Sequence, residues 1–337
     1  MYNNIDTRHQ TPDTRHQTPD TRHQTPDTRH FIECIKYVYR RVFPAFLRTE
    51  LFRFRNYELY RQVKRRKRQK TEVIAYLENE CAHTDNTEKK EMLNYLKQSK
   101  SDSIVFPYKF TEKYISKEIS VYTDSPCNLK YVLHEGKKLY LPKWMNLNEI
   151  QGYYNGLLIE QDADSPHCYA KEGFYVEEGD VIADVGCAEA IWALSNVERA
   201  SKVYLFECEE KWMEPLRKTF EPWQEKVYII NKYISNKNDG MYITLDDFLQ
   251  GAHIHVIKAD IEGAEVALLE GAKNTLKRGN IKLLMCTYHR ENDARDIEKI
   301  LSENEFTIAF SKGYMLFIYD KDFAPPYLRQ ALIYAKK

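Results

Sequence analysis

The spacing of apolar and polar residues changes along the chain and predicts its elements. From residue 180 onward, short apolar runs alternate with segments whose apolar residues recur at helical spacing. The runs are VIADV, VYLFE, VYII, VIKAD, KLLMC and FTIAF, with YMLFIY last, and helices are expected over 189–199, 210–220, 264–276 and 293–301. This alternation predicts an α/β fold in which helices wrap a parallel sheet.

The last two apolar runs, 306–310 and 314–319, are separated only by residues 311–313. A connection this short permits only antiparallel pairing, so we expect a terminal hairpin at one edge of the sheet. Five parallel strands with a terminal antiparallel hairpin is the Rossmann-like topology of class I methyltransferases, by analogy of fold. We expect this domain over 180–320, followed by a C-terminal tail over 321–337.

The residues before this domain form three further segments. Residues 1–30 are expected to be disordered, because residues 6–30 repeat DTRHQTP, with no apolar side chain and a proline in each full unit. Residues 31–100 are expected to form a basic helical arm, with two basic helices within 31–70 and a further helix over 71–98. Residues 101–179 are expected to be a β-rich extension that includes a hairpin around Glu135 and Gly136.

The repeat also suggests a property of the gene. A tandem CAGACAC unit, translated through all three frames, returns the same heptapeptide. We therefore hypothesise a slippage-prone DNA tract whose gain or loss of one unit switches expression off or on. A duplicated coding unit or a linker is the alternative.

The chain has no net charge, but its charges are unevenly distributed along the sequence. The chain has 50 Lys and Arg against 50 Asp and Glu, so its formal net charge is zero, which disfavours nucleic acid as a partner. Residues 31–70 nevertheless carry +10 and residues 71–337 carry −10. Nine aromatic residues lie among the cations of 31–70. This segment could contact an anionic membrane surface, bind nucleic acid, or fold onto the acidic remainder of the chain.

Cysteine usage and hydropathy indicate the compartment. The seven cysteines are scattered and contain no C-x-x-C pair, which argues against a disulfide framework or a structural zinc site. No apolar run reaches the roughly 18 residues of a membrane span, and the N-terminus lacks the apolar region of a signal peptide. We predict a cytoplasmic protein, with peripheral contact at the inner membrane face left open for residues 31–70.

Candidate chemistry begins at the end of the first strand, in DVGCAEA, residues 184–190. A dinucleotide fingerprint needs G-x-G-x-x-G, but Ala188 and Glu189 follow Gly186, so a dinucleotide is disfavoured. S-adenosylmethionine carries no phosphate and is cationic, and a tight turn with carboxylates at Asp184 and Glu189 suits it electrostatically.

The second strand ends in an acid that would complete this cofactor site. Glu207 follows Asp184 by 23 residues, close to the roughly 20-residue offset of ribose-binding carboxylates. Its carboxylate can accept hydrogen bonds from both ribose hydroxyls. An acid at a strand end can also be merely solvated, so the prediction depends on the two strands together.

The motifs DVGCAEA, LFE, TLDDFL, IKADIEGAE, LLEGA and TYH, in this order, resemble the FkbM-type family of S-adenosylmethionine-dependent methyltransferases over about residues 180–318. The resemblance implies O-methylation, commonly of sugars in secondary metabolites or surface glycans. It implies that Asp184, Gly186 and Glu207 contact the cofactor, and that Asp260, Glu262 and His289 line the reaction site. The family usually has glycine where Ala190 stands and proline where Cys208 stands, so Ala190 suits the turn only if its φ is negative.

The residues themselves support a reaction site at the fourth strand. Methyl transfer to a hydroxyl needs a base, and Asp260 lies at the carboxyl end of this strand. His289 follows the fifth strand and is an alternative base. Alternatively, the acids at 260, 262 and 265 serve only to stabilise the N-terminus of the next helix through its dipole. No metal is expected, since His253 and His255 lack a third ligand at a recognisable spacing.

The sequence thus predicts an S-adenosylmethionine-dependent O-methyltransferase that acts on a small molecule or a glycan precursor. Asp260, His289 and Glu262 are the catalytic candidates, and the cofactor candidates are Asp184, Gly186, Ala188, Glu189 and Glu207. The loop over 164–169 either covers the site or is a plain turn. An RNA methyltransferase that uses the basic arm, or a non-catalytic module with a degenerate cofactor turn, are the alternatives.

Overall fold

The computed structural model describes residues 57–100, 104–319 and 323–337. The chain divides into two compact units, Met1–Glu72 and Val73–Lys337, and each is treated by itself. The heptapeptide repeat and residues 31–56 of the predicted basic arm lie outside the described residues.

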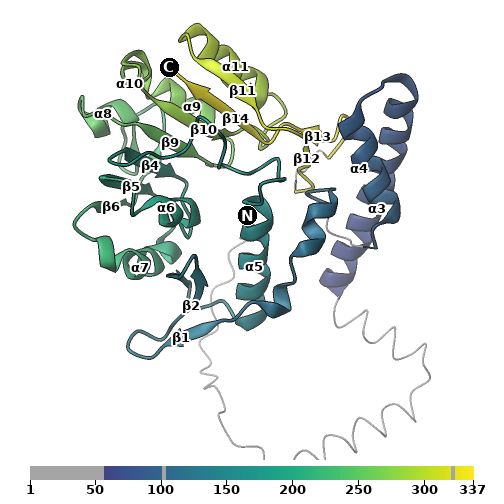
Figure 1. The fold of residues 1–337 in the computed structure, drawn as a ribbon, viewed down its shortest axis with the longest axis horizontal. Helices are drawn as coiled ribbons and strands as arrows, with labels where there is room; N and C mark the ends of the chain where they lie inside the picture. The colour runs from purple at the N-terminus through teal and green to yellow at the C-terminus, as the bar shows by residue number, and fades with distance from the viewer. Residues whose placement is uncertain (1–56, 101–103, 320–322) are drawn as a thin grey trace, which may run out of the picture. The chain divides into compact units, whose positions relative to one another are not determined.

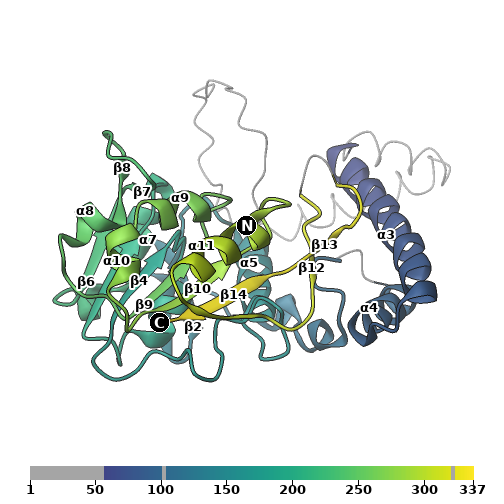
Figure 2. The same cartoon turned by 90° about the horizontal axis from the view of Figure 1, so that it is seen from above.

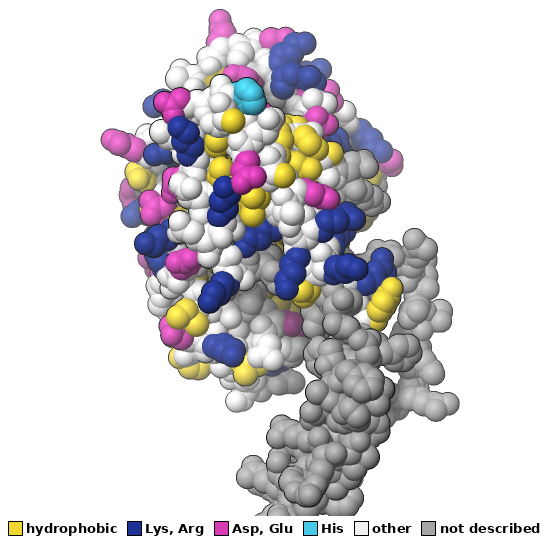
Figure 3. All heavy atoms as spheres, turned by 90° about the vertical axis from the view of Figure 1, so that its right-hand side faces the viewer, with side chains coloured by type: hydrophobic (Ala, Val, Ile, Leu, Met, Phe, Trp, Pro, Cys, Tyr) yellow, Lys and Arg dark blue, Asp and Glu magenta, His cyan; other side chains and the backbone are white. Residues whose placement is uncertain are grey.

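The remainder of the predicted arm is one long helix followed by a short one. Helix α3 runs without a break over Tyr57–His83, because no glycine or proline interrupts it, so the expected boundary near residue 70 was wrong. Helix α4 spans Thr87–Gln98 and is capped by Asn86, whose side chain accepts a hydrogen bond from the Lys89 amide. Lys and Arg side chains are interspersed with Asp and Glu on the face drawn in Figure 3. No helix within the described residues is both long and apolar enough to cross a bilayer, and contact of residues 31–70 with a membrane surface stays a prediction.

The segment before the large sheet is only partly β-structure. Strands β1 (Tyr122–Asp124), β2 (Leu129–His134) and β3 (Lys137–Leu141) form an antiparallel sheet. The hairpin around Glu135 and Gly136 is confirmed, and both turn residues have positive φ. Two short 3-10 helices, η1 (Lys109–Lys113) and η2 (Ser116–Glu118), precede it. The expectation of a β-rich extension missed helix α5 (Leu147–Glu160), which begins with a capping box between Asn146 and Glu149.

A seven-stranded mixed sheet forms the body of the second unit (Figure 1). Its strand order is β11-β14-β10-β9-β4-β5-β6, and β14 alone runs antiparallel to its neighbours in this sheet. The strands are β4 (Val181–Val185), β5 (Lys202–Phe206), β6 (Val227–Ile230), β9 (Val256–Ala259), β10 (Lys282–Cys286), β11 (Thr307–Phe310) and β14 (Leu332–Lys336). The predicted α/β fold with a largely parallel sheet is therefore confirmed.

The antiparallel strand is not the one expected. β14 lies between β10 and β11, so the predicted pairing of 306–310 with 314–319 was wrong. Met315–Leu316 forms β12, which pairs with β13 (Leu328–Arg329) in a separate two-stranded sheet. The segment expected to be a tail therefore supplies an interior strand, second from the edge of the sheet. The physical reason is burial: residues 332–335 are all buried, as a strand with neighbours on both sides requires.

Helices cover both faces of this sheet (Figure 2). Alternate residues of each strand belong to two separate apolar clusters: Ile182 of β4 packs with α5, α6 (Ile191–Asn196) and α7 (Glu210–Thr219), whereas Ala183 and Val185 face the other cluster. That second cluster contains α8 (Leu245–Leu249), α9 (Glu265–Glu270), α10 (Lys273–Lys277) and α11 (Asp293–Glu303). The remaining short elements are η3 (Glu221–Trp223), β7 (Tyr233–Ile234) and β8 (Tyr242–Ile243). The result is a three-layer fold whose strands β4, β5, β9 and β10 end at one edge.

We predict that Ile333→Ala destabilises the protein by about 3 kcal/mol, because Ile333 is fully buried at the centre of β14. Denaturant unfolding monitored by circular dichroism measures the loss. Ile115→Ala is the matched control, since Ile115 is 52% exposed and its truncation should cost less than about 0.5 kcal/mol. Equal small losses in both variants would contradict an interior position for β14.

Candidate active site

The turn after β4 passes so close to the end of β9 that only glycine fits at residue 186. Gly186 has φ +69°, and a Cβ added there would lie 2.0 Å from the backbone oxygen of Asp260. Because real Cβ contacts are never this short, a side chain at 186 would push the two turns apart. The predicted cofactor turn and the predicted reaction site are therefore neighbours in space.

Two alanines in the same turn adopt the left-handed conformation. Ala188 has φ +47° and Ala190 has φ +63°. The condition that Ala190 should have negative φ is not met, and its Cβ costs about 1–2 kcal/mol in this region. Helix α6 nevertheless begins here, since the Leu194 amide donates to the Ala190 carbonyl at 2.9 Å. Alanine thus occupies a position whose backbone is of the kind that favours glycine.

Glu207 reaches from the end of β5 to this turn. Its Oε2 accepts a hydrogen bond from the Ala188 amide at 2.9 Å, and its Oε1 accepts one from the Glu209 amide at 2.7 Å. Burial raises the pKa of Glu207, while these amide donors oppose the shift. Each carboxylate oxygen takes one bond from the backbone and keeps a lone pair for a further donor.

Asp184 lies behind the turn rather than on it. Its carboxylate is 1% exposed and forms an ion pair with Lys258, with 2.9 Å between Oδ1 and Nζ. The same ammonium group donates to the Gly186 carbonyl at 3.0 Å. Burial raises the pKa of Asp184, and the Lys258 charge counteracts it. Lys258 therefore ties the end of β9 to the β4 turn, a role that the sequence analysis missed.

Further acids surround the turn on the α5 side. The Tyr153 hydroxyl of α5 donates to Glu189, which is buried. Burial, with repulsion from Asp260 and Glu189, raises the pKa of Glu160 at the end of α5 to about 8. Carboxyl groups crowded in this way favour a cationic ligand, whose charge would relieve their repulsion.

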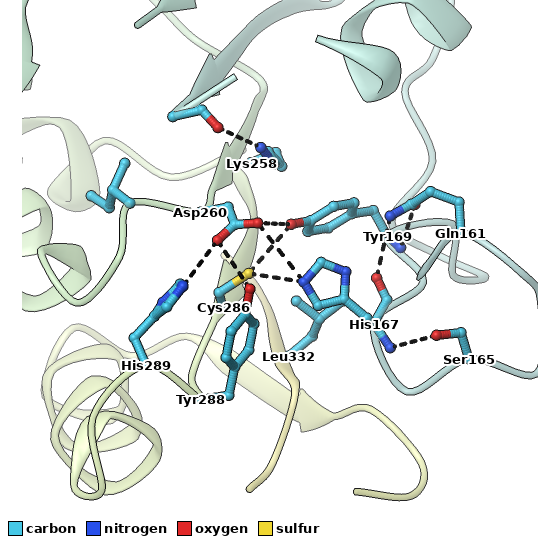
Figure 4. Close-up of polar contacts among 12 residues, drawn as sticks. Gln161, Ser165, His167, Tyr169, Lys258, Asp260, Cys286, Tyr288, His289 and Leu332 are labelled. Atoms are coloured by element: carbon cyan, nitrogen blue, oxygen red, sulfur yellow. Dashed lines mark hydrogen bonds and ion pairs between the residues drawn. The ribbon is translucent and has the colours of Figure 1, made fainter. Parts of the chain in front are cut away.

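Asp260 lies at the centre of a cluster of polar side chains (Figure 4). Tyr169 donates its hydroxyl to Oδ2 at 3.2 Å, and Tyr288 donates to Oδ1 at 3.3 Å. His289 Nε2 lies 3.4 Å from Oδ1, and His167 Nε2 lies 3.8 Å from Oδ2. The side chain of Asp260 is 12% exposed and those of the two histidines less. Asp260 is thus the most accessible of these three groups.

Glu265, and not Glu262, completes this cluster. Glu262 is exposed, with φ +52°, and the structure does not bring it to Asp260. Glu265 is fully buried, accepts the Ile261 amide at 3.0 Å, and lies 3.0 Å from Nδ1 of His289. The sequence motif contains both acids, and only the local turn decides which of them faces inward.

The charges of the cluster follow from these contacts. Burial raises the pKa of Asp260, but the neighbouring His289, Lys258 and His167 outweigh it and hold the value below the usual range. Burial lowers the pKa of His167 to about 4. For His289, burial is outweighed by Glu265 and Asp260, so its pKa is raised. These contacts favour an ionised carboxylate at 260 and a neutral imidazole at 167, and they shift His289 toward its protonated form.

The loop over 164–169 is part of the site, although none of its residues was selected from the sequence. His167 and Tyr169 come from it, and both also contact Cys286 at the end of β10, at 3.5 Å and 3.3 Å. The indication in the sequence was that this loop, DSPHCY, contains carboxylate, hydroxyl, imidazole and thiol groups just before the predicted cofactor domain. Nothing in its spacing showed that the loop reaches Asp260.

Two trios among the described residues have ligand atoms within 4.8 Å of one another: His167, Asp260 and Cys286, and Asp260, Glu265 and His289. Their members already contact one another through hydrogen bonds and ion pairs, and we assign no metal to either trio. The other pair considered, His253 and His255, lies elsewhere: His255 Nδ1 accepts the Val181 amide at 2.9 Å, at the opposite end of β4.

Residues 239–308 match the model of the methyltransferase FkbM domain. The chain contains an FkbM-type methyltransferase domain. The matched residues include Asp260, Glu265 and His289 of the site, and a methyltransferase domain of this kind implies the use of S-adenosylmethionine. A comparison with curated proteins found no match.

The comparison with solved structures found partial similarities. One is the methyltransferase FkbM from Methylobacillus flagellatus KT, with 16% identity and a TM-score of 0.40 over 56% of this chain and 53% of that one. Another is precorrin-6y C5,15-methyltransferase from Geobacter metallireducens GS-15, with 9% identity and a TM-score of 0.36 over 49% and 83% of the two chains. This chain thus spans about half the length of the Methylobacillus protein.

We predict that Gly186→Ala destabilises the protein by about 3 kcal/mol or more, because the new Cβ meets the Asp260 carbonyl. Gly136→Ala is the matched control: its φ of +79° is as strained, but nothing lies within 4 Å of the added Cβ, so about 1 kcal/mol is expected. Chemical denaturation measures both. Similar losses in the two variants would show that the close approach of the turns does not constrain residue 186.

Lys258→Met is expected to cost about 3–5 kcal/mol, because it leaves the Asp184 carboxylate buried without a cation. Adding Asp184→Asn should restore part of this stability, and denaturation of the single and double variants gives the coupling. In Lys258→Met the folded-state pKa of Asp184 lies above its unfolded value, so the deficit should grow as pH rises from 5 to 8. Additive effects with no pH dependence would contradict the ion pair.

Proposed function

We propose that this protein is an S-adenosylmethionine-dependent O-methyltransferase that methylates a hydroxyl of a saccharide or surface-glycan precursor. The observation that carries the proposal is the Asp260 carboxylate at the end of β9, next to the glycine turn of an FkbM-type domain. In-line methyl transfer needs an acceptor oxygen and a base held beside the cofactor, and this juxtaposition supplies the base.

The residues around the β4 turn fit a cationic nucleoside. Glu207 has a lone pair on each oxygen left for the ribose hydroxyls after binding two backbone amides. Glu189 and Glu160 place two further carboxyl groups near the turn, and the pKa of each is raised, so a cationic ligand would favour their ionised forms. S-adenosylmethionine supplies an electrophilic methyl group on a positively charged sulfur, which this surplus of carboxyl groups favours.

On the acceptor side, Asp260 takes the proton of the attacking hydroxyl. Bound S-adenosylmethionine would supply the methyl group to the acceptor oxygen, and its sulfur would keep the electron pair of the broken sulfur–carbon bond. Tyr169 and Tyr288 hold the carboxylate through their hydroxyl groups and fix its orientation. Aromatic rings combined with hydroxyl and imidazole groups are suited to a polyhydroxylated acceptor, which supports a saccharide.

The basic arm supports an RNA acceptor only weakly, because the net charge of the chain is zero. A non-catalytic module is the remaining alternative, since Ala190 adopts a conformation that favours glycine. The cofactor-binding arm of the following experiment separates that module from an enzyme.

We expect the protein to transfer radiolabelled methyl from S-adenosylmethionine to glycan or lipid-linked sugar fractions and not to RNA. Asp260→Asn should lower kcat about 100-fold or more with cofactor affinity little changed, because it removes the base. Glu207→Gln should instead weaken cofactor binding about tenfold or more by calorimetry, since one acceptor oxygen becomes a donor. Asp239→Asn, 74% exposed, is the control and should change neither.

Each contrary outcome has a distinct meaning. Methylation of RNA alone would replace the glycan by a nucleic-acid acceptor. Absence of S-adenosylmethionine binding at millimolar concentration would favour the non-catalytic module. Full activity in Asp260→Asn would remove Asp260 from the reaction.

A further inference from the structure

We propose that His289 acts as a fixed cation between Glu265 and Asp260, and that Glu265 and His289 are positioning residues which hold Asp260 as the base. The inference rests on the proposed function and deepens it, because the sequence left open whether Asp260 or His289 is the base. It also gives a role to Glu265, which the sequence analysis did not select.

The geometry places one carboxylate at each nitrogen of the imidazole ring. Nδ1 of His289 lies 3.0 Å from Oε1 of Glu265, and Nε2 lies 3.4 Å from Oδ1 of Asp260. Glu265 is itself fixed, because it is fully buried and the same Oε1 accepts the Ile261 amide from the turn that carries Asp260. The three side chains thus form a chain from the start of α9 to the end of β9.

The number of N–H groups on the His289 ring favours its protonated form. A neutral imidazole has a single N–H, so one of its nitrogens would turn a lone pair toward a carboxylate. The protonated ring carries an N–H on each nitrogen: Nδ1 contacts Glu265, and Nε2, which forms no hydrogen bond among the described residues, lies at ion-pair distance from Asp260, so protonation replaces the repulsion by attraction. The pKa of His289 is raised because Glu265, Asp260 and also Glu262 outweigh burial, which agrees with this state.

Apart from Glu160, the other groups that face Asp260 do not supply a competing base. They are Lys258 on β9, Cys286 and Tyr288 on and after β10, His167 and Tyr169 from the 164–169 loop, and Glu160 of α5. Burial raises the pKa of the thiol and of both phenols well above neutrality and lowers that of His167 to about 4. His289 and Lys258 are therefore the cations that face Asp260 among the described residues.

A histidine held in this way has no free lone pair with which to accept the acceptor proton. Asp260 keeps its Oδ2, the oxygen on the side away from His289, for that proton. Activity then requires an ionised Asp260 and a protonated His289. The acidic limb of the pH profile reports the carboxylate, and the alkaline limb reports the imidazolium.

The test is Glu265→Gln, which keeps the shape of the side chain and removes its charge. We expect the pKa of His289, followed by NMR of carbon-labelled imidazole, to fall by about one pH unit or more, and the alkaline limb of kcat to move with it. His289→Asn identifies the resonance. Glu298→Gln, on the exposed face of α11, is the matched control and should leave the titration unchanged. Cofactor affinity should stay within about twofold in all variants, as expected of residues that act on the base.

His289→Lys provides a second readout. A lysine restores the cation and is a poor base at neutral pH, so it should keep more activity than His289→Gln if the residue acts through its charge. Equal inactivity of the Lys and Gln variants in folded protein would overturn the cation role. An unchanged His289 titration in Glu265→Gln, or loss of activity on chelation of divalent cations, would also overturn the proposal.

The NMR titration does not depend on the acceptor. If no fraction is methylated but His289 still titrates as expected, the proposed function fails and the arrangement of the charges stands. If methylation occurs but His289 titrates below its ordinary range in the wild-type protein, only the positioning role fails.

Discussion

The close approach of two turns organises the site. At Gly186 the backbone of the β4 turn lies against the carbonyl of Asp260, at a separation that admits no side chain. Lys258 joins the same two turns from within the sheet by binding both Asp184 and the Gly186 carbonyl. The predicted cofactor turn and the predicted reaction site therefore share one close contact, and a displacement of either turn would move the other.

Most of the sheet could be predicted from the sequence, because buried parallel strands appear as short apolar runs. The runs that became β4, β5, β6, β9, β10 and β11 were placed within a residue or two. The antiparallel strand was misplaced because YMLFIY is as apolar as LIYAK, and only tertiary pairing chooses between them. Helix α5 was missed since its polar cap and aromatic residues also suit a turn between strands.

The site was predictable as far as strand ends define it. Asp260, His289 and Glu207 follow strands β9, β10 and β5, and parallel strands deliver such residues to one edge of the sheet. His167 and Tyr169 enter from a loop far away in sequence, for which no periodicity exists. The choice of Glu265 over Glu262 depends on the positive φ of Glu262, which turns that side chain outward. Contacts set by tertiary structure, or by one backbone angle, leave no trace in a single sequence.

The position of β14 also bears on how the chain is assembled during synthesis. Strands β10 and β11 emerge from the ribosome well before residues 332–336, which must later enter the gap between them. Until then both strands present open hydrogen-bonding edges, which can pair with other chains. An interior strand of the sheet is therefore added after both of its neighbours have been synthesised. A nascent chain that stalls before Leu332 would leave the edges of β10 and β11 unpaired and would be prone to aggregate.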